Sequence, residues 1–215
     1  MVIITSIAAL ATAWCAYEAT VWSGIQTFRL AEANDLRRRS VEARLEGTQV
    51  VALDVQQFIA WIEARQRGEA QLTSFFFDRF RPELARATTE WLESNPFENE
   101  SAEPHPFELE SYQVADFHRA HALEQRATRV HREAHAANHH ADLYMLATVL
   151  LAMVLFVVAS GPKQGTDWTH RIFLLVTALF LAGALGYVAS HPVRWTSGPD
   201  PLPPPEPYER PRLAD

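Results

Sequence analysis

Histidine is the residue type whose number and spacing in this sequence most suggest chemistry. Six of the nine histidines lie in one stretch: His118, His121, His131, His135, His139 and His140. Three of them, His131, His135 and His139, recur every four residues, so on a helix they share one face. Asp142 follows three residues later, near the same face. This histidine face is the first candidate site.

Three interpretations of the histidine face stay open. Histidines at positions i and i+4 can bind one metal ion, which makes His131, His135 and His139 candidate ligands of a divalent metal. The imidazoles could instead gain protons together near about pH 6 and act as a pH sensor. The third interpretation is a solvated surface that binds no ligand. The sequence favours the third, because it identifies no residues that would orient the metal ligands.

Other candidates for chemistry are few. The sequence has no glycine-rich phosphate loop, no G-x-S-x-G motif and no H-E-x-x-H motif. Cys15 lies in an apolar stretch, where thiols are usually unreactive. Glu18 follows that stretch, and an acidic residue at membrane depth is a functional candidate. For Glu18 we favour a position at the water interface, where Tyr17 and Trp22 would form an aromatic belt. We predict no catalytic residues, no enzyme activity and no cofactor beyond the candidate metal.

Composition restricts the class of partner. Of the 215 residues, 48% are hydrophobic and 21% are charged, and the net charge is −7. Phosphate binding needs a basic patch, so the acidic balance argues against nucleic acid as a partner. The single cysteine excludes a disulfide within the chain. Long apolar runs indicate the lipid bilayer instead.

Three apolar stretches predict membrane-spanning helices at residues 1–22, 143–160 and 171–190. Residues 1–17 carry no charged side chain, and this length is near the minimum for a hydrocarbon core of ~30 Å. A signal peptide cleaved after Ala13 is the alternative for this segment, although the usual positive n-region is missing.

Two connecting segments complete the predicted membrane region. Residues 161–170 form a short loop between the second and third spans. Residues 191–215 contain eight prolines and are expected to be a disordered or polyproline-II tail.

Residues 23–142 are predicted to form a helical hairpin domain outside the membrane, resembling a coiled coil. Its first leg is residues 29–67, ended by Gly68. Its second leg is residues 107–142, which lead without proline or glycine into the second span, so residues 107–160 are predicted to be one helix. At ~1.5 Å per residue each leg is roughly 55 Å long, as expected for a hairpin that leaves and re-enters one membrane.

Short aromatic helices are expected to cap the hairpin. Residues 71–80 and 82–93 are the predicted helices, with Pro82 as a first-turn residue, and residues 97–106 form an acidic loop. The side chains expected to be buried are Phe58, Trp61, Phe76, Phe80, Trp91 and Phe117.

Small residues recur in the third span at steps of four: Ala178, Ala182, Gly186 and Ser190. This spacing lets helix backbones approach closely. Packing within the chain's own helix bundle is favoured over a seam between two chains.

Arginine distribution predicts the orientation. With three spans, residues 23–142 and the C-terminal tail lie on one side of the membrane. That side holds most of the arginines near the membrane, including the run Arg37, Arg38 and Arg39. The positive-inside rule places the hairpin domain in the cytoplasm.

Several short patterns carry a resemblance. They are Trp14-x-x-Tyr17 with Trp22-x-x-x-Gln26, the run Arg79–Leu84 (RFRPEL), Trp91, Asn95-Pro96, and Tyr144 at the start of the paired C-terminal spans. The chain resembles a family of uncharacterised bacterial membrane proteins with one N-terminal span, a helical insert and two C-terminal spans. The resemblance covers most of residues 8–190. It implies the architecture and no activity.

We therefore expect an all-α, multi-pass protein of the bacterial inner membrane with three transmembrane helices. The favoured function is a non-enzymatic scaffold or interaction protein that binds further copies of itself or another membrane protein. The alternative is a metal- or pH-responsive sensor or transport accessory that uses the histidine face.

Overall fold

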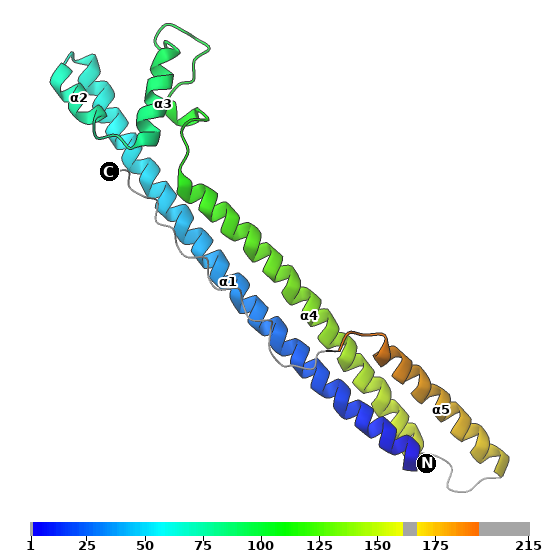
Figure 1. Ribbon diagram of the computed structural model, residues 1–215. Helices are drawn as coiled ribbons and strands as arrows, with labels where there is room; N and C mark the ends of the chain where they lie inside the picture. Colours follow the sequence, from blue (N-terminus) through cyan, green and yellow to red (C-terminus); the bar gives the residue numbers. More distant parts are fainter. Residues whose placement is uncertain (1, 161–166, 194–215) are drawn as a thin grey trace. The chain divides into compact units, whose positions relative to one another are not determined.

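The computed structural model describes residues 2–160 and 167–193, and every regular element in these ranges is a helix (Figure 1). In chain order these are α1 (Val2–Gln66), α2 (Ala70–Phe77), α3 (Pro82–Glu93), the short 3-10 helix η1 (Pro106–Glu108), α4 (Ala115–Ala159) and α5 (Asp167–Ala189). The predicted all-α class is confirmed. The predicted loop at 161–170 and tail at 191–215 lie largely outside the described residues.

The chain divides into two compact units. The terminal unit comprises residues 1–33 and 128–215, and the central unit comprises residues 34–127. Helices α1 and α4 each contribute to both units. Each unit has its own hydrophobic cluster.

Three helices are long and apolar enough to cross a membrane: α1 through its N-terminal part, α4 through its C-terminal part, and α5 over Arg171–Ala189. Only 17–33% of the residues in their apolar windows are buried inside the protein. Most of these apolar side chains therefore face outward, as in helices that are solvated by lipid.

The end of α1 is fixed by local chemistry. Gly68 has φ +75°, a conformation that glycine adopts without steric cost. Its N–H donates to the carbonyl of Arg65 across 3.1 Å, and the N–H of Glu69 donates to Ala64 across 3.0 Å. This pair of bonds is a Schellman motif, so the predicted glycine C-cap is confirmed.

The start of α4 differs from the prediction. The helix begins at Ala115 rather than at Phe107, so residues 107–160 are not one helix. Pro106 instead opens η1, and Leu109 is extended with ψ 143°. The side chains of Phe107 and Tyr112 pack against the aromatic cluster of the central unit. This packing outweighs the local helix propensity of the segment.

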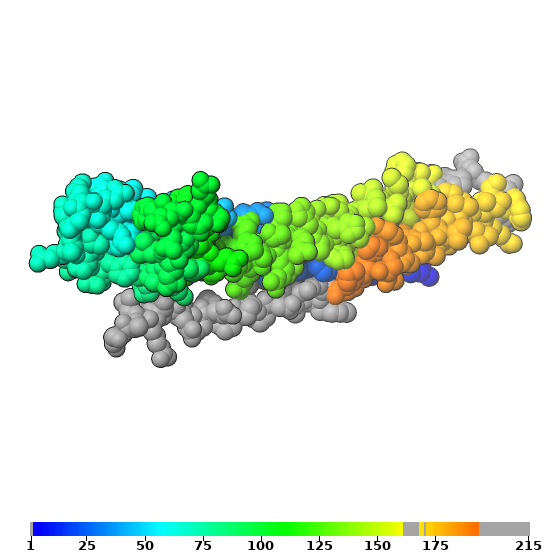
Figure 2. Space-filling view, turned by 90° about the horizontal axis from the view of Figure 1, so that it is seen from above, coloured from blue at the N-terminus to red at the C-terminus, as the bar shows by residue number. Residues whose placement is uncertain are grey.

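The central unit is built on aromatic rings that lie beneath the surface drawn in cyan to green in Figure 2. Its buried core is Phe58, Trp61, Phe80, Leu84 and Trp91. The ring of Phe58 meets the ring of Trp91 edge-on at 5.5 Å, a favourable geometry for aromatic pairs. Helix α3 occupies the predicted residues, whereas α2 ends at Phe77 rather than at residue 80.

The predicted burial of aromatic side chains is mostly confirmed. Phe58, Trp61, Phe80 and Trp91 are buried, and Phe76 is half-buried. Phe117 is the exception, because 39% of it is exposed. Its ring lies over Gly47 of α1, outside the aromatic cluster.

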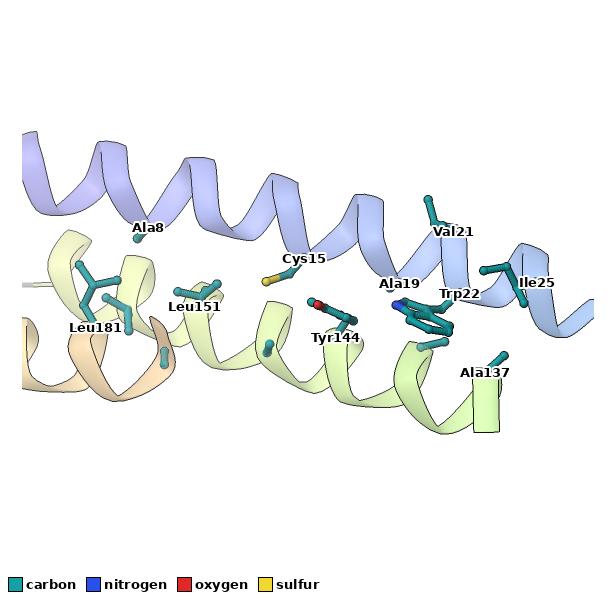
Figure 3. Close-up of a cluster of buried hydrophobic side chains, with 14 of the residues drawn as sticks. Ala8, Cys15, Ala19, Val21, Trp22, Ile25, Ala137, Tyr144, Leu151 and Leu181 are labelled. Atoms are coloured by element: carbon teal, nitrogen blue, oxygen red, sulfur yellow. The ribbon is translucent and has the colours of Figure 1, made fainter. Parts of the chain in front are cut away.

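The terminal unit packs small residues of α1 against larger residues of α4. Figure 3 shows Ala8, Cys15 and Ala19 of α1 on the side that faces Tyr144 and Leu151 of α4. Helix α5 runs beside the second part of α4 (Figures 1 and 2) and adds Leu181 and Ala184 to the same cluster. Close approach of helices at small residues is typical of packing in membranes.

Candidate functional site

The histidine face is only partly assembled. Nε2 of His135 lies 3.1 Å from Nε2 of His131, and their rings are nearly perpendicular at 4.6 Å. His139 instead lies beside His140, with ring centroids 6.1 Å apart. Asp142 accepts a hydrogen bond from Asn138 on its own helix. Within the described ranges, no three His, Cys, Asp or Glu residues are placed to hold a metal ion.

The contact between His131 and His135 has a chemical consequence. A hydrogen bond between two Nε2 atoms requires one nitrogen to carry a proton and the other to present a lone pair. Two of the three predicted metal ligands are therefore within reach of one ion, and the third is not. The metal site stays a prediction that needs a ligand from elsewhere.

A second group of polar side chains gathers where α1, α4 and α5 meet in the terminal unit. The Tyr144 hydroxyl donates to the carbonyl of Pro192 across 3.0 Å, which ties α4 to the segment after α5. The rings of Tyr187 and His191 lie 4.6 Å apart. The ring of His140 lies 4.5 Å from Trp22 of α1. Tyr144, predicted only as a boundary residue, thus joins α4 to the segment after α5.

Burial sets the protonation of His140. Desolvation lowers its pKa below the ordinary value, and the neighbouring imidazoles of His139 and His191 lower it further. Protonation of His140 therefore opposes its packing against Trp22.

Glu18 belongs to the same part of the terminal unit. Its side chain is fully buried within the protein. The position at the water interface that we expect from the sequence stays a prediction. Glu18 interacts electrostatically with Cys15 and Tyr144. The sequence identifies Glu18 as a charged residue in an apolar region, but it does not identify the side chains that enclose Glu18.

An ion-pair network that sequence analysis missed holds the central unit together. The carboxylate of Asp54 on α1 is only 1% exposed. Its Oδ2 accepts a hydrogen bond from Arg81 Nη1 at 2.8 Å and another from the Tyr112 hydroxyl at 2.9 Å. Arg81 also pairs with Glu83 at 3.1 Å. Three chain segments, at α1, before α3 and after η1, meet at one carboxylate.

The chemistry of this network is structural. The pKa of Tyr112 is raised well above its ordinary value, first by burial and then by its hydrogen bond to Asp54. The phenol therefore stays protonated as a donor. Trp91 adds a further tie, since its indole Nε1 donates to the carbonyl of Glu103 across 2.8 Å.

In the central unit, α1 has two different faces. One face is buried and carries Leu36, Ser40, Ala43, Gly47 and Asp54. The Ser40 hydroxyl donates to the carbonyl of Ala120 on α4 across 2.8 Å. A Cβ atom at Gly47 would come within 2.9 Å of the Phe117 ring, so α4 lies close against this face.

The opposite face of α1 carries large apolar side chains that no part of the central unit covers. Val41, Leu45, Leu53 and Ile59 are 57%, 58%, 60% and 49% exposed. Rows of this kind on a water-exposed surface mark sites of interaction.

The small residues of α5 turn away from the chain's own bundle. Ala178, Ala182, Gly186 and Ser190 are all exposed, and a Cβ atom at Gly186 would meet nothing within 4 Å. The buried face of α5 carries Thr177, Leu181 and Ala184 instead. The expectation that the small residues pack within this chain is therefore wrong. Packing against a helix of another molecule stays a prediction.

Among the hollows on the surface of the described residues, two differ in chemical character. In the central unit, Trp61, Arg65 and Phe77 line an open groove of about 530 Å³. In the terminal unit, Phe156 of α4 and Phe180 of α5 line an apolar cavity of about 350 Å³. The first combines aromatic and charged side chains, and the second is lined by apolar side chains apart from Thr177.

Comparisons with known proteins found no match: no family model, no curated protein and no solved structure is similar to this chain. The resemblance to an uncharacterised bacterial membrane family therefore stays a prediction.

Proposed function

We propose that this chain is a scaffold or interaction protein anchored in the bacterial inner membrane, and that it associates with further copies of itself. The observation that carries the proposal is the exposed apolar row of α1 in the central unit, represented by Val41, Leu45 and Ile59. Charged residues flank this row, among them Arg38 and Glu42, which suits water rather than hydrocarbon. Lipid then does not cover the row, and a row of apolar side chains exposed to water is a candidate surface for binding another protein.

The proposed anchor is the terminal unit. Its three apolar helices supply the spans, and their outward-facing apolar side chains contact lipid. With the central unit in the cytoplasm, Arg37, Arg38 and Arg39 lie on the side that the positive-inside rule favours. The proposed role is non-enzymatic: the central unit presents a helical surface at the membrane.

The copy number in a lipid environment tests this proposal. The full chain would be reconstituted in lipid nanodiscs, and the mass of protein per disc would be measured over a range of protein-to-disc ratios. We expect discs with several copies even when discs are in large excess. A single copy per disc under those conditions would overturn the proposed self-association.

The contact between His131 and His135 favours a second candidate function, which is sensing of a divalent metal or of pH. Their Nε2 atoms, 3.1 Å apart, are close enough to share one zinc ion. Zinc would be titrated into the full chain and into a variant with alanine at positions 131, 135 and 139. Tighter binding by the native chain supports a metal site, whereas equal and weak binding by both excludes it.

A further inference from the structure

The exposed row of α1 in the central unit has the spacing of a coiled coil. Apolar or small side chains occur at positions 41, 45, 48, 52, 55, 59 and 62, which alternate steps of four and three. We call this set the outer seam. Positions 41, 45, 48, 52 and 59 are exposed, and Val55 and Ile62 are half-buried. Burying Thr48 in an interface would cost little free energy, because its hydroxyl already donates a hydrogen bond to the carbonyl of Arg44.

We propose that the outer seam is a parallel, in-register coiled-coil interface between copies of this chain. The proposal rests on the proposed function and names the surface through which self-association occurs. In heptad terms, Leu45, Ala52 and Ile59 take the a positions, and Val41, Thr48, Val55 and Ile62 take the d positions.

From position 41 to position 59 the outer seam is distinct from the contact within the chain, whereas Ile62 at its end packs against the aromatic cluster. Several residues that α4 and the aromatic core cover, namely Ser40, Gly47, Asp54 and Trp61, fall at the c positions of the same heptads, and Phe58 of the aromatic core falls at a g position. At 100° per residue the c positions lie about 160° around the helix from the a positions and about 100° from the d positions. A partner helix on the outer seam would not displace α4.

The proposed membrane anchor makes a second copy of the chain the expected partner of the outer seam. Copies inserted in one membrane share one orientation, so their α1 helices run parallel and equal residues come to equal depth. In a parallel coiled coil, each g position faces the e position five residues later on the neighbouring helix. Arg37 then faces Glu42 of the neighbouring copy, and Arg44 faces Gln49. No pair of like charges arises along the outer seam.

The core side chains also indicate the number of copies. All four d positions hold β-branched residues, and Leu45 holds an a position. Parallel dimers prefer leucine at d, whereas leucine at a with β-branched residues at d favours three or four helices. The outer seam therefore fits an assembly of three or four chains better than a pair.

Disulfide cross-linking in native membranes tests the outer seam. Cys15→Ala removes the only cysteine, and single cysteines then replace Leu45 or Ile59 in the seam. Glu46→Cys is the matched control, because position 46 is exposed and only one residue away but points to the side. In a parallel, in-register seam, equal core positions are within disulfide distance. We expect linked chains to form at least about tenfold faster at positions 45 and 59 than at position 46.

Three results would overturn the proposal. Equal rates at positions 45 and 46 would show random collision, and absence of linkage at positions 45 and 59 would remove the seam. Linkage to a protein of different mass would identify a different partner. The mass measurement in nanodiscs separates the two claims: several copies per disc without seam cross-links leave self-association standing and reject only this interface.

Discussion

Arg81 donates a hydrogen bond to Asp54 in an asymmetric pair, since the carboxylate of Asp54 is 1% exposed and the side chain of Arg81 is 35% exposed. Loss of Arg81 leaves a carboxylate in the protein interior, whereas loss of the Asp54 charge leaves a guanidinium that water and Glu83 still solvate. The two halves of one ion pair therefore differ in their importance for stability.

The first prediction follows from this asymmetry. We expect Arg81→Leu to lower the free energy of unfolding by about 2–3 kcal/mol, allowing for the partial exposure of Arg81. Asp54→Asn should cost less, about 1–2 kcal/mol. Urea unfolding of the full chain in detergent, followed by tryptophan fluorescence, measures both. Arg67→Leu breaks the exposed ion pair with Glu63 and should change little. A larger loss for Asp54→Asn than for Arg81→Leu would refute the asymmetry.

The second prediction concerns Tyr112 in alkali. An unfolded tyrosine ionises near pH ~10, whereas burial and Asp54 raise the pKa of folded Tyr112. The unfolded state then loses its proton first, so the stability that this phenol contributes is present below pH ~10 and is lost as the pH rises further. Tyr112→Phe should lower stability at neutral pH by about 1 kcal/mol and flatten the alkaline decline. An unchanged alkaline slope in the variant would contradict this account.

The third prediction compares two glycines of α1. A side chain at Gly47 meets the Phe117 ring, whereas a Cβ atom at Gly24 meets nothing within 4 Å. Gly47→Leu should therefore destabilise the protein by about 1–3 kcal/mol through overpacking. Gly24→Ala should stabilise it by about 0.5–1 kcal/mol through helix propensity. Thermal unfolding followed by circular dichroism measures both effects, and a stable Gly47→Leu variant would show that α4 is not closely packed there.

The fourth prediction concerns acid. Because burial lowers the pKa of folded His140, the unfolded state gains this proton at higher pH than the folded state does. The stability linked to neutral His140 is therefore complete above pH ~6.5 and is lost as the pH falls through that value towards the folded pKa. We expect His140→Gln to reduce the fall in melting temperature between about pH 7 and pH 5. His118→Gln is the control for an exposed histidine, and an equal effect of both would rule out a specific role for His140.

Local chemistry made some elements predictable from the sequence. Gly68 ends α1 and Pro82 opens α3, because the backbone preferences of glycine and proline act within a few residues. The start of α4 was not predictable in this way. Phe107 and Tyr112 leave the helix to join the aromatic cluster, and that gain depends on rings supplied by distant segments.

The candidate sites depended still more on distant contacts. Asp54 stands alone among apolar residues in the sequence, and its partners Arg81 and Tyr112 lie 27 and 58 residues away. Periodicity showed that Ala178, Ala182 and Gly186 share a face, but not that this face turns outward. The outer seam could be identified only from the structure, which shows the face of α1 that is covered by α4.

The claim that α4 crosses the bilayer underlies the proposed anchor, and cysteine accessibility tests it most directly. In the Cys15→Ala background, single cysteines would replace Ser101 in the central unit and Lys163 between α4 and α5. Intact cells, with any outer membrane permeabilised, would be treated with a membrane-impermeant maleimide. We predict that the cysteine at 163 is labelled and that the cysteine at 101 is protected until the inner membrane is broken. Equal labelling of both positions in intact cells would contradict the account.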